Sequence, residues 1–200
     1  MNTPSPRLGA VAASVGVLLL ALPVARRTLE QAMSVQMLLQ FPLLVLAGWL
    51  LARALPARCR HQADRWNNHG IPGLLAVALV LAISMVPRVL DLALVDSRVE
   101  FAKFVLLVGC GSALQLSWHR AGHLVQGFFL GNVLPMTAAV GQLYQDSPVR
   151  LCNAYLLGDQ TRLGLSLVVL AVLFGVAWIG ALFRRMSMSN SSQLLPKESS

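Results

Sequence analysis

The stretch Leu163 to Phe183, with the sequence LGLSLVVLAVLFGVAWIGALF, decides the fold class of this chain. It carries no charged residue, and its length matches the roughly 20 apolar residues with which an α-helix crosses the hydrocarbon core of a membrane. Inside lipid the backbone polar groups must bond to one another, which a helix achieves within a single segment. The stretch therefore predicts a transmembrane helix.

Five further apolar segments repeat this pattern along the chain. They run over residues 8–25, 33–55, 71–94, 99–118 and 124–143. Together with 163–183 they predict an all-α, polytopic bundle of six transmembrane helices within residues 1–186. The polar, serine-rich stretch 187–200 is predicted to be a disordered tail. For the first segment a cleaved signal peptide is the alternative interpretation.

The composition excludes several classes of protein. The 200 residues are 56% hydrophobic and 12% charged, whereas about 25% of the residues in a soluble domain are charged. The net charge is +8, but the arginines lie at the ends of apolar segments, which indicates contacts with membrane lipids and not with nucleic acid. The sequence has no nucleophile elbow, Gly-rich phosphate loop or catalytic carboxylate pair, so we expect no enzyme.

The basic residues in the connections predict the orientation, because cytoplasmic connections carry an excess of Lys and Arg. With the amino terminus inside, the inside holds two acidic residues, Asp64 and Glu198, and nine basic ones: Arg7, Arg53, Arg58, Arg60, Arg65, Arg120, Arg184, Arg185 and Lys197. The outside then holds the other seven basic and six acidic residues. We therefore expect both termini in the cytoplasm, although Arg26 and Arg27 on the outside oppose this bias.

Polar side chains gather near the predicted outer face, where burial in lipid is costly unless they pair or serve a function. They are Gln36, Gln40, Asp91, Glu100, Lys103, Asp159 and Gln160. Glu100 and Lys103 are three residues apart, so they share a face of one helix. Two interpretations stay open: an ion-pair network that fixes helix packing, or a solvent-accessible polar site.

Two further groups of residues have metal-binding chemistry. Met33, Met37 and Met136 belong to the same outer region, and thioether sulfur suits Cu(I), although methionine also fills gaps in apolar cores. His119 and His123 form an HxxxH pair without the glutamate of a zinc protease motif. Because the pair falls in a short inside connection, a headgroup or loop role is favoured over metal binding.

Small residues and prolines predict where helices approach closely or bend. Gly127 and Gly131 form a GxxxG step, and Gly109 and Gly111 lie in the fourth segment, so close helix contacts are predicted there. The prolines Pro42, Pro87 and Pro135 predict bends in the second, third and fifth helices.

Three stretches carry a resemblance to a known family. They are MSVQMLLQFPLLVL from Met33 to Leu46, then VPRVLDLAL with VEFAKFVLLVGCGSALQLSW within Val86 to Trp118, and finally LY with RLCNAYLLGDQTRLG within Leu143 to Gly164. In order and spacing the chain resembles the CtaG family of membrane proteins, which is linked to assembly of copper-containing cytochrome oxidase. From the first to the last, the stretches span residues 33–164, roughly two thirds of the chain.

The resemblance implies a compact helical bundle in a bacterial inner membrane and a role in copper supply or oxidase assembly without catalysis. Family histidines align with Met33 or Met37 and with Lys103, and none of those imidazoles is present here. Methionines in their place predict a softer Cu(I) site. Alternatively, the Lys103 ammonium, which cannot bind a metal, occupies the metal's place and balances Asp91, Glu100 or Asp159.

Three functions follow from these observations as expectations. The first is an accessory protein that assists the assembly or copper supply of a cytochrome oxidase or another copper-dependent membrane complex. The second is a non-catalytic structural subunit of such a complex, favoured by the small-residue helix faces. A small-solute or ion transporter is a weaker third, because no inverted repeat is visible.

Overall fold

The structure, a computed structural model, describes residues 6–22, 25, 29, 32–147 and 157–193. Within these ranges the chain is helical without any strand, which confirms the predicted all-α class. In chain order the elements are α1 (Pro6–Ala21), α3 (Met33–Val35), η1 (Gln36–Gln40), α4 (Phe41–Arg53), α5 (Ala57–Trp66), η2 (Asn68–Gly70), α6 (Ile71–Ser84), α7 (Pro87–Val95), α8 (Ser97–Trp118), α9 (His123–Asp146) and α10 (Leu157–Gln193).

Four helices of the described chain are long and apolar enough to cross a membrane. They are Met33–Arg53, which combines α3, η1 and α4, together with α8, α9 and Gly158–Arg184 of α10. The pair α6 and α7 makes a fifth if both are taken as one span. The prediction of a helical membrane protein is supported in this form, but the exact number of six spans is not confirmed.

Helix α1 explains part of the difference from six spans. It has 16 residues, fewer than the roughly 20 that a perpendicular span needs. The predicted segment 8–25 was longer, and its residues 23–24 lie outside the described residues. Among the described elements α1 packs on α4, with Leu8, Leu18 and Leu19 exposed. The signal-peptide alternative for this segment stays a prediction.

The predicted segment 71–94 is divided into two helices. Helix α6 ends at Ser84, α7 begins at Pro87, and the two are bent by 74°. Proline has no N–H to continue a helix, and it disfavours the helical conformation of the residue before it. Val86 is accordingly extended, with φ −74° and ψ 122°. The bend predicted at Pro87 is thus a break between two helices.

Helix α10 continues without interruption to Gln193 and so includes residues 187–193 of the predicted tail. No glycine or proline lies between Gly180 and Pro196, so the helix meets no strong breaker as it leaves the apolar segment. Residues 194–200, the rest of the predicted tail, lie outside the described residues. A further helix that the hydropathy pattern did not predict, α5, fills the basic connection between α4 and α6.

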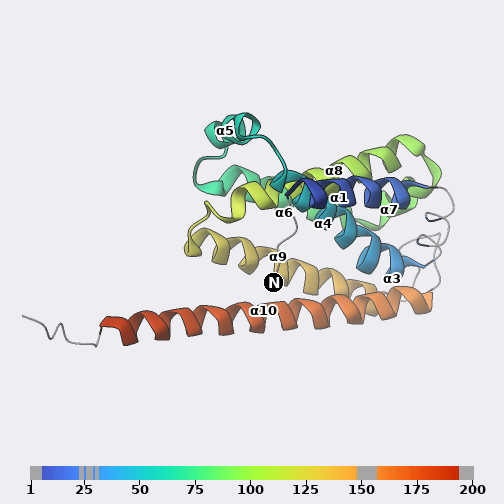
Figure 1. Cartoon of the computed structure of the whole chain (residues 1–200). Coiled ribbons are helices and arrows are strands. Elements are labelled where there is room, and N and C mark those ends of the chain that lie inside the picture. Colours follow the sequence, from blue (N-terminus) through green and yellow to red (C-terminus); the bar gives the residue numbers. More distant parts are fainter. Residues whose placement is uncertain (1–5, 23–24, 26–28, 30–31, 148–156, 194–200) are drawn as a thin grey trace, which may run out of the picture.

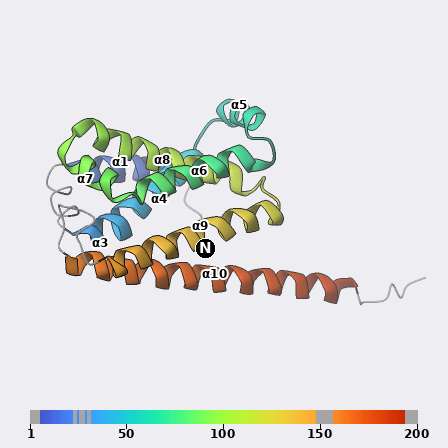
Figure 2. The ribbon, with the colours of Figure 1, turned by 180° about the vertical axis from the view of Figure 1, so that it is seen from behind.

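The helices form two groups that lie side by side (Figures 1 and 2). In the first group α8 packs against α4, α6 and α7. In the second, α9 and α10 run antiparallel and join the first group where α6 meets α9 and α3 meets α10. Helices α3 and α7 and the start of α10 lie at one end of the bundle, while α5 and the α8–α9 turn lie at the other (Figure 1).

Glycines let the backbones approach within each group. A Cβ added at Gly111 of α8 would lie 1.9 Å from the carbonyl oxygen of Val45, so α4 and α8 touch backbone to backbone there. Ser112 strengthens the contact by donating from its hydroxyl to the Gly48 carbonyl at 2.9 Å. In the second group the corresponding close contact joins Gly141 of α9 to Gly164 of α10.

Candidate functional site

The polar site is built on a π-helical turn, η1, that spans Gln36–Gln40. Pro42 lies two residues after this turn, and because it cannot donate to the carbonyl four residues earlier, a wider turn relieves the local helix geometry. π turns of this kind occur often at functional sites. Here the turn places Gln36, Met37 and Gln40 in the interior, where both glutamines are fully buried.

Lys103 of α8 faces this turn from the neighbouring helix. Its ammonium donates to Gln40 Oε1 at 3.5 Å and lies 5.5 Å from the centre of the Phe104 ring. Glu100, one turn earlier on α8, is buried as well, with 6% of its surface exposed. Both ionisable groups are thus enclosed near the start of α8, a helix that is long enough to cross a membrane.

Gln40 is incompletely satisfied in this cluster. Its Oε1 accepts from Lys103, but within the described chain its Nε2 has no hydrogen-bond partner. A buried amide donor without a partner costs about 1–3 kcal/mol. The arrangement therefore retains capacity for one further acceptor, such as a water molecule or a ligand oxygen.

Asp159 and Gln160 at the start of α10 tie this end of the bundle together. Asp159 accepts hydrogen bonds from the backbone N–H of Ser34 at 3.1 Å and from the Ser34 hydroxyl at 2.5 Å. The carboxylate thus lies at the positive N-terminal end of α3, a position that stabilises negative charge. Gln160 is buried and donates to the backbone carbonyl of Tyr144 at 3.1 Å.

The structure therefore distributes the predicted polar residues over two contacts at the same end. Gln40 and Lys103 meet between α4 and α8, whereas Asp159 and Gln160 hold α10 to α3 and α9. Asp91 is half-buried on α7, a helix that packs against α8. We call the end that carries Gln40, Lys103 and Asp159 the polar end.

The candidate copper ligands are brought together only in part. Met33 and Met37 are buried in one apolar cluster with Leu90, Tyr144, Leu163 and Leu167. Met85, at the break between α6 and α7, packs against the same cluster and was not among the predicted ligands. Met136 is half-buried on α9, outside this cluster. No group of three or more His, Cys, Asp or Glu residues suited to a metal occurs in the described ranges.

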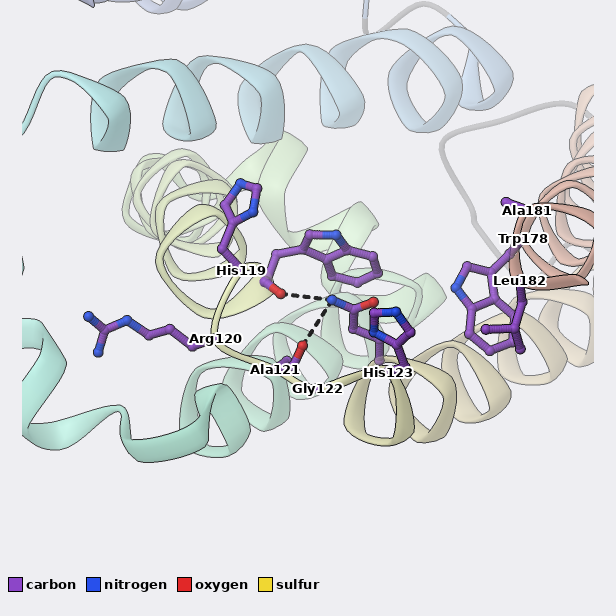
Figure 3. Close-up of a pocket in the computed structure, with 10 residues that line it drawn as sticks. His119, Arg120, Ala121, Gly122, His123, Trp178, Ala181 and Leu182 are labelled. Atoms are coloured by element: carbon purple, nitrogen blue, oxygen red, sulfur yellow. Dashed lines mark hydrogen bonds between the residues drawn. The ribbon is translucent and has the colours of Figure 1, made fainter. Parts of the chain in front are cut away.

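The opposite end carries a cavity of about 450 Å³ where α8 turns into α9 (Figure 3). Its lining includes Trp118, His119 and His123 from the turn and Trp178 from α10. Figure 3 shows His123 and Trp178 near each other and His119 on the α8 side. The HxxxH spacing therefore does not put both histidines on one helix, since His119 caps the end of α8 and His123 begins α9.

Sequence reasoning missed Ser34, Met85 and Tyr144 as parts of the polar end. Tyr144 is fully buried, and its hydroxyl donates to the Met85 carbonyl at 2.8 Å. A tyrosine within an apolar helix was one available signal, because a buried phenol usually finds a partner. Its partner depends on the break before Pro87, which hydropathy did not reveal.

Comparison with protein-family models, with curated proteins and with solved structures gives no match for this chain.

Proposed function

We propose that the chain is a non-catalytic accessory protein of a bacterial inner membrane that assists the assembly or copper supply of a copper-dependent membrane complex, such as a cytochrome oxidase. The proposal rests on the resemblance of residues 33–46, 86–118 and 143–164 to the CtaG family. It is supported by the apolar spans and by one observation in particular, the convergence of methionines at the polar end.

The methionines supply donors of the right chemistry for Cu(I). Met33 and Met37 share one buried cluster, and Met85 packs against it from another helix. Thioether sulfur is soft and neutral, and it prefers Cu(I) to divalent ions of other metals. We expect these three residues to hold the ion, which a carrier would pass to a partner protein. Met136 is left out of this ligand set because it lies outside the cluster.

A second candidate function is a structural subunit of a membrane complex, and Lys103 favours it. The ammonium is enclosed between α4 and α8, at a position that aligns with a family histidine, and it cannot bind a metal. In that case the methionines only fill space around Tyr144, which is their common role in apolar cores. The two candidates differ in whether the polar end binds copper.

Copper loading tests the proposal directly. The detergent-purified protein is incubated with Cu(I) under anaerobic, reducing conditions, desalted, and analysed for copper per chain. Near-stoichiometric copper is expected for the wild type, with loss in Met33→Leu/Met37→Leu and weakening in Met85→Leu. Leucine conserves side-chain volume closely enough to keep the fold, which thermal unfolding of each variant checks.

Met136→Leu is the matched control, because it removes a half-buried methionine of α9 that lies outside the cluster. It is expected to keep its copper. Background copper in the wild type, or equal loss in the control, would reject the methionine site and leave the structural-subunit function. Co-purification separates the two roles further: an assembly protein is recovered with its partner transiently, whereas a subunit is recovered at fixed stoichiometry.

A further inference from the structure

The cavity at the α8–α9 turn shares no lining residue with the methionine cluster, and the turn lies at the opposite end of the bundle from α3 (Figure 1). Its volume of about 450 Å³ is in the range of sites for small molecules. Three elements enclose it: the end of α8, the start of α9, and the stretch of α10 around Trp178. We refer to it as the turn cavity.

The turn itself is held in a defined shape. Gln126 of α9 donates from its side-chain amide to the carbonyls of Trp118 at 2.9 Å and Ala121 at 3.0 Å, as the dashed lines in Figure 3 show. Trp118 also packs edge-to-face on Phe129, with ring centres 6.4 Å apart. The polar groups of the cavity are therefore presented on a fixed frame and not on a loose loop.

Hydrogen-bond donors line the polar side of the turn cavity. His119 and His123 are both exposed, and each imidazole carries at least one N–H donor in either protonation state. None of the described lining residues is acidic. Arg120 also borders the cavity, but its guanidinium is paired with Asp64 of α5 and points away from the other lining residues (Figure 3). Apart from Arg120, the two imidazoles are thus the exposed side-chain donors of the described lining.

The opposite side of the turn cavity is apolar and aromatic. It is formed by Trp118, Trp178 and Leu182, all half-buried. Tryptophan is enriched where a transmembrane helix passes from hydrocarbon into the headgroup layer. Leu182 and Trp178 lie near the end of the apolar part of α10, and the exposed Arg184 follows directly. A cavity with donors on one side and Trp and Leu on the other suits a ligand that is itself polar at one end and apolar at the other.

The excess of basic residues at this end of the bundle favours an anionic ligand. Besides Arg120, the exposed arginines among the described residues of this end, which we call the basic end, are Arg53, Arg58, Arg60, Arg65 and Arg184. The acidic group described here, Asp64, is already paired with Arg120. Basic pockets between helices at a membrane surface attract anionic headgroups.

We propose that the turn cavity binds a phosphate-bearing anion, which in a membrane is the headgroup of an anionic phospholipid. His119 and His123 donate to the phosphate oxygens, and the glycerol and upper acyl carbons lie along Trp178 and Leu182. The lipid would bridge α10 to the α8–α9 turn and so fix the α9–α10 pair at the membrane surface.

Fluorescence quenching by brominated lipid tests the site. The full chain with Trp49→Phe/Trp66→Phe, which keeps the two cavity tryptophans, is reconstituted in phosphatidylcholine vesicles that contain brominated phosphatidylglycerol. The reverse labelling, brominated phosphatidylcholine with plain phosphatidylglycerol, gives the relative affinity. We expect preferential quenching by the anionic lipid, and a preference lowered about five-fold or more in His119→Ala/His123→Ala, since two hydrogen bonds are lost.

The matched control removes two other exposed histidines of the basic end, His61→Ala/His69→Asn. Asparagine is chosen because the φ of His69 is +58°, a left-handed conformation that asparagine tolerates. This control is expected to keep the lipid preference. Equal quenching by both lipids, or an equal loss in the control, would overturn the proposal, since the attraction would then be that of the whole surface.

A second arm separates the lipid from free phosphate. Inorganic phosphate is titrated onto the same chain in pure phosphatidylcholine vesicles, and thermal unfolding is followed. We expect phosphate to raise the unfolding temperature of the wild type no more than that of His119→Ala/His123→Ala, at phosphate concentrations equal to those of the anionic lipid in the quenching experiment. A histidine-dependent stabilisation by phosphate alone would assign the cavity to a soluble anion and overturn the lipid assignment.

Discussion

At the scale of single residues, Tyr144 compensates for the helix break before Pro87. A break frees backbone carbonyls that the next helical turn would have bonded. The N–H of Val89, which would reach the Met85 carbonyl in a continuous helix, bonds to Val86 instead at 3.0 Å. The Tyr144 hydroxyl donates to the Met85 carbonyl at 2.8 Å from α9. One side chain thus satisfies the break and links the two groups of helices.

Replacing Tyr144 by phenylalanine tests this role. Tyr144→Phe keeps the ring in the cluster but leaves the partly buried Met85 carbonyl without this donor, so a loss of about 1–3 kcal/mol in the free energy of unfolding is expected. Denaturant unfolding in detergent measures it. Ser166→Ala is the control, because it removes a hydroxyl that bonds to Arg162 of its own helix on an exposed face. A variant Tyr144→Phe as stable as this control would contradict the role.

For the polar end, the sequence predicts which residues lie at the same level of the membrane, but not which of them contact one another. Hydropathy gives the depth of Gln36, Gln40, Glu100 and Lys103 in their helices, and burial of these four follows from the cost of polar groups in lipid. Which side chains pair between two helices depends on how each helix is rotated about its own axis. The spacing of apolar residues does not determine that rotation when every face of the helix is apolar. The pairing of Asp159 with Ser34 could not be predicted for that reason.

At the scale of elements, glycines decide how closely two helices pack, but glycines near each other on one helix differ in whether they lie at a helix contact. On α8 a Cβ at Gly111 would lie 1.9 Å from the Val45 carbonyl oxygen, whereas one at Gly109 would meet nothing within 4 Å. The two predicted positions are therefore not equivalent. On α9 the GxxxG step differs in the same way: Gly127 contacts Trp178, and Gly131 meets nothing within 4 Å.

Gly111→Ala is expected to lower the free energy of unfolding by about 1–3 kcal/mol, because the added methyl forces α4 and α8 apart. Gly109→Ala, two residues away on the same helix, is expected to be neutral or slightly stabilising, since alanine favours a helix more than glycine does. Parallel unfolding curves of the two variants in detergent make the comparison. Equal loss in both would mean that glycine acts through the helix itself and not through the α4–α8 contact.

The elements also show where hydropathy succeeds and where it fails. Segments with many consecutive apolar residues, such as 163–183, appear as helices at the predicted places. The break between α6 and α7 is not detected when hydropathy is averaged along the sequence, because residues 84–87 do not lower the average enough to separate two segments. Helix α5 is not detected by hydropathy either, because its ten residues are mostly polar and exposed and so form no apolar segment.

At the scale of the whole molecule, the two ends of the bundle differ in charge and chemistry. The polar end encloses Lys103 and Glu100 and holds the buried Met33 and Met37, while the basic end exposes arginines and carries the turn cavity. A chain with such an asymmetry has one preferred orientation, because arginine-rich connections are retained on the cytoplasmic side. The orientation with the basic end inside is a prediction that native cysteines can test.

Cys59 reports the side on which the basic end lies. It is exposed on α5, between Arg58 and Arg60, whereas Cys110 is buried in α8. In a Cys152→Ser background, a membrane-impermeant maleimide is expected to label Cys59 in inverted vesicles but not in intact cells. Ser97→Cys with Cys59→Ser is the converse control, because Ser97 is exposed at the opposite end of the bundle, and labelling from the cell exterior is expected.

Labelling of Cys59 from outside would place the turn cavity in the outer leaflet and the methionines toward the cytoplasm. If the methionines hold Cu(I), as we propose, the ion would then reach them from the cytoplasmic side.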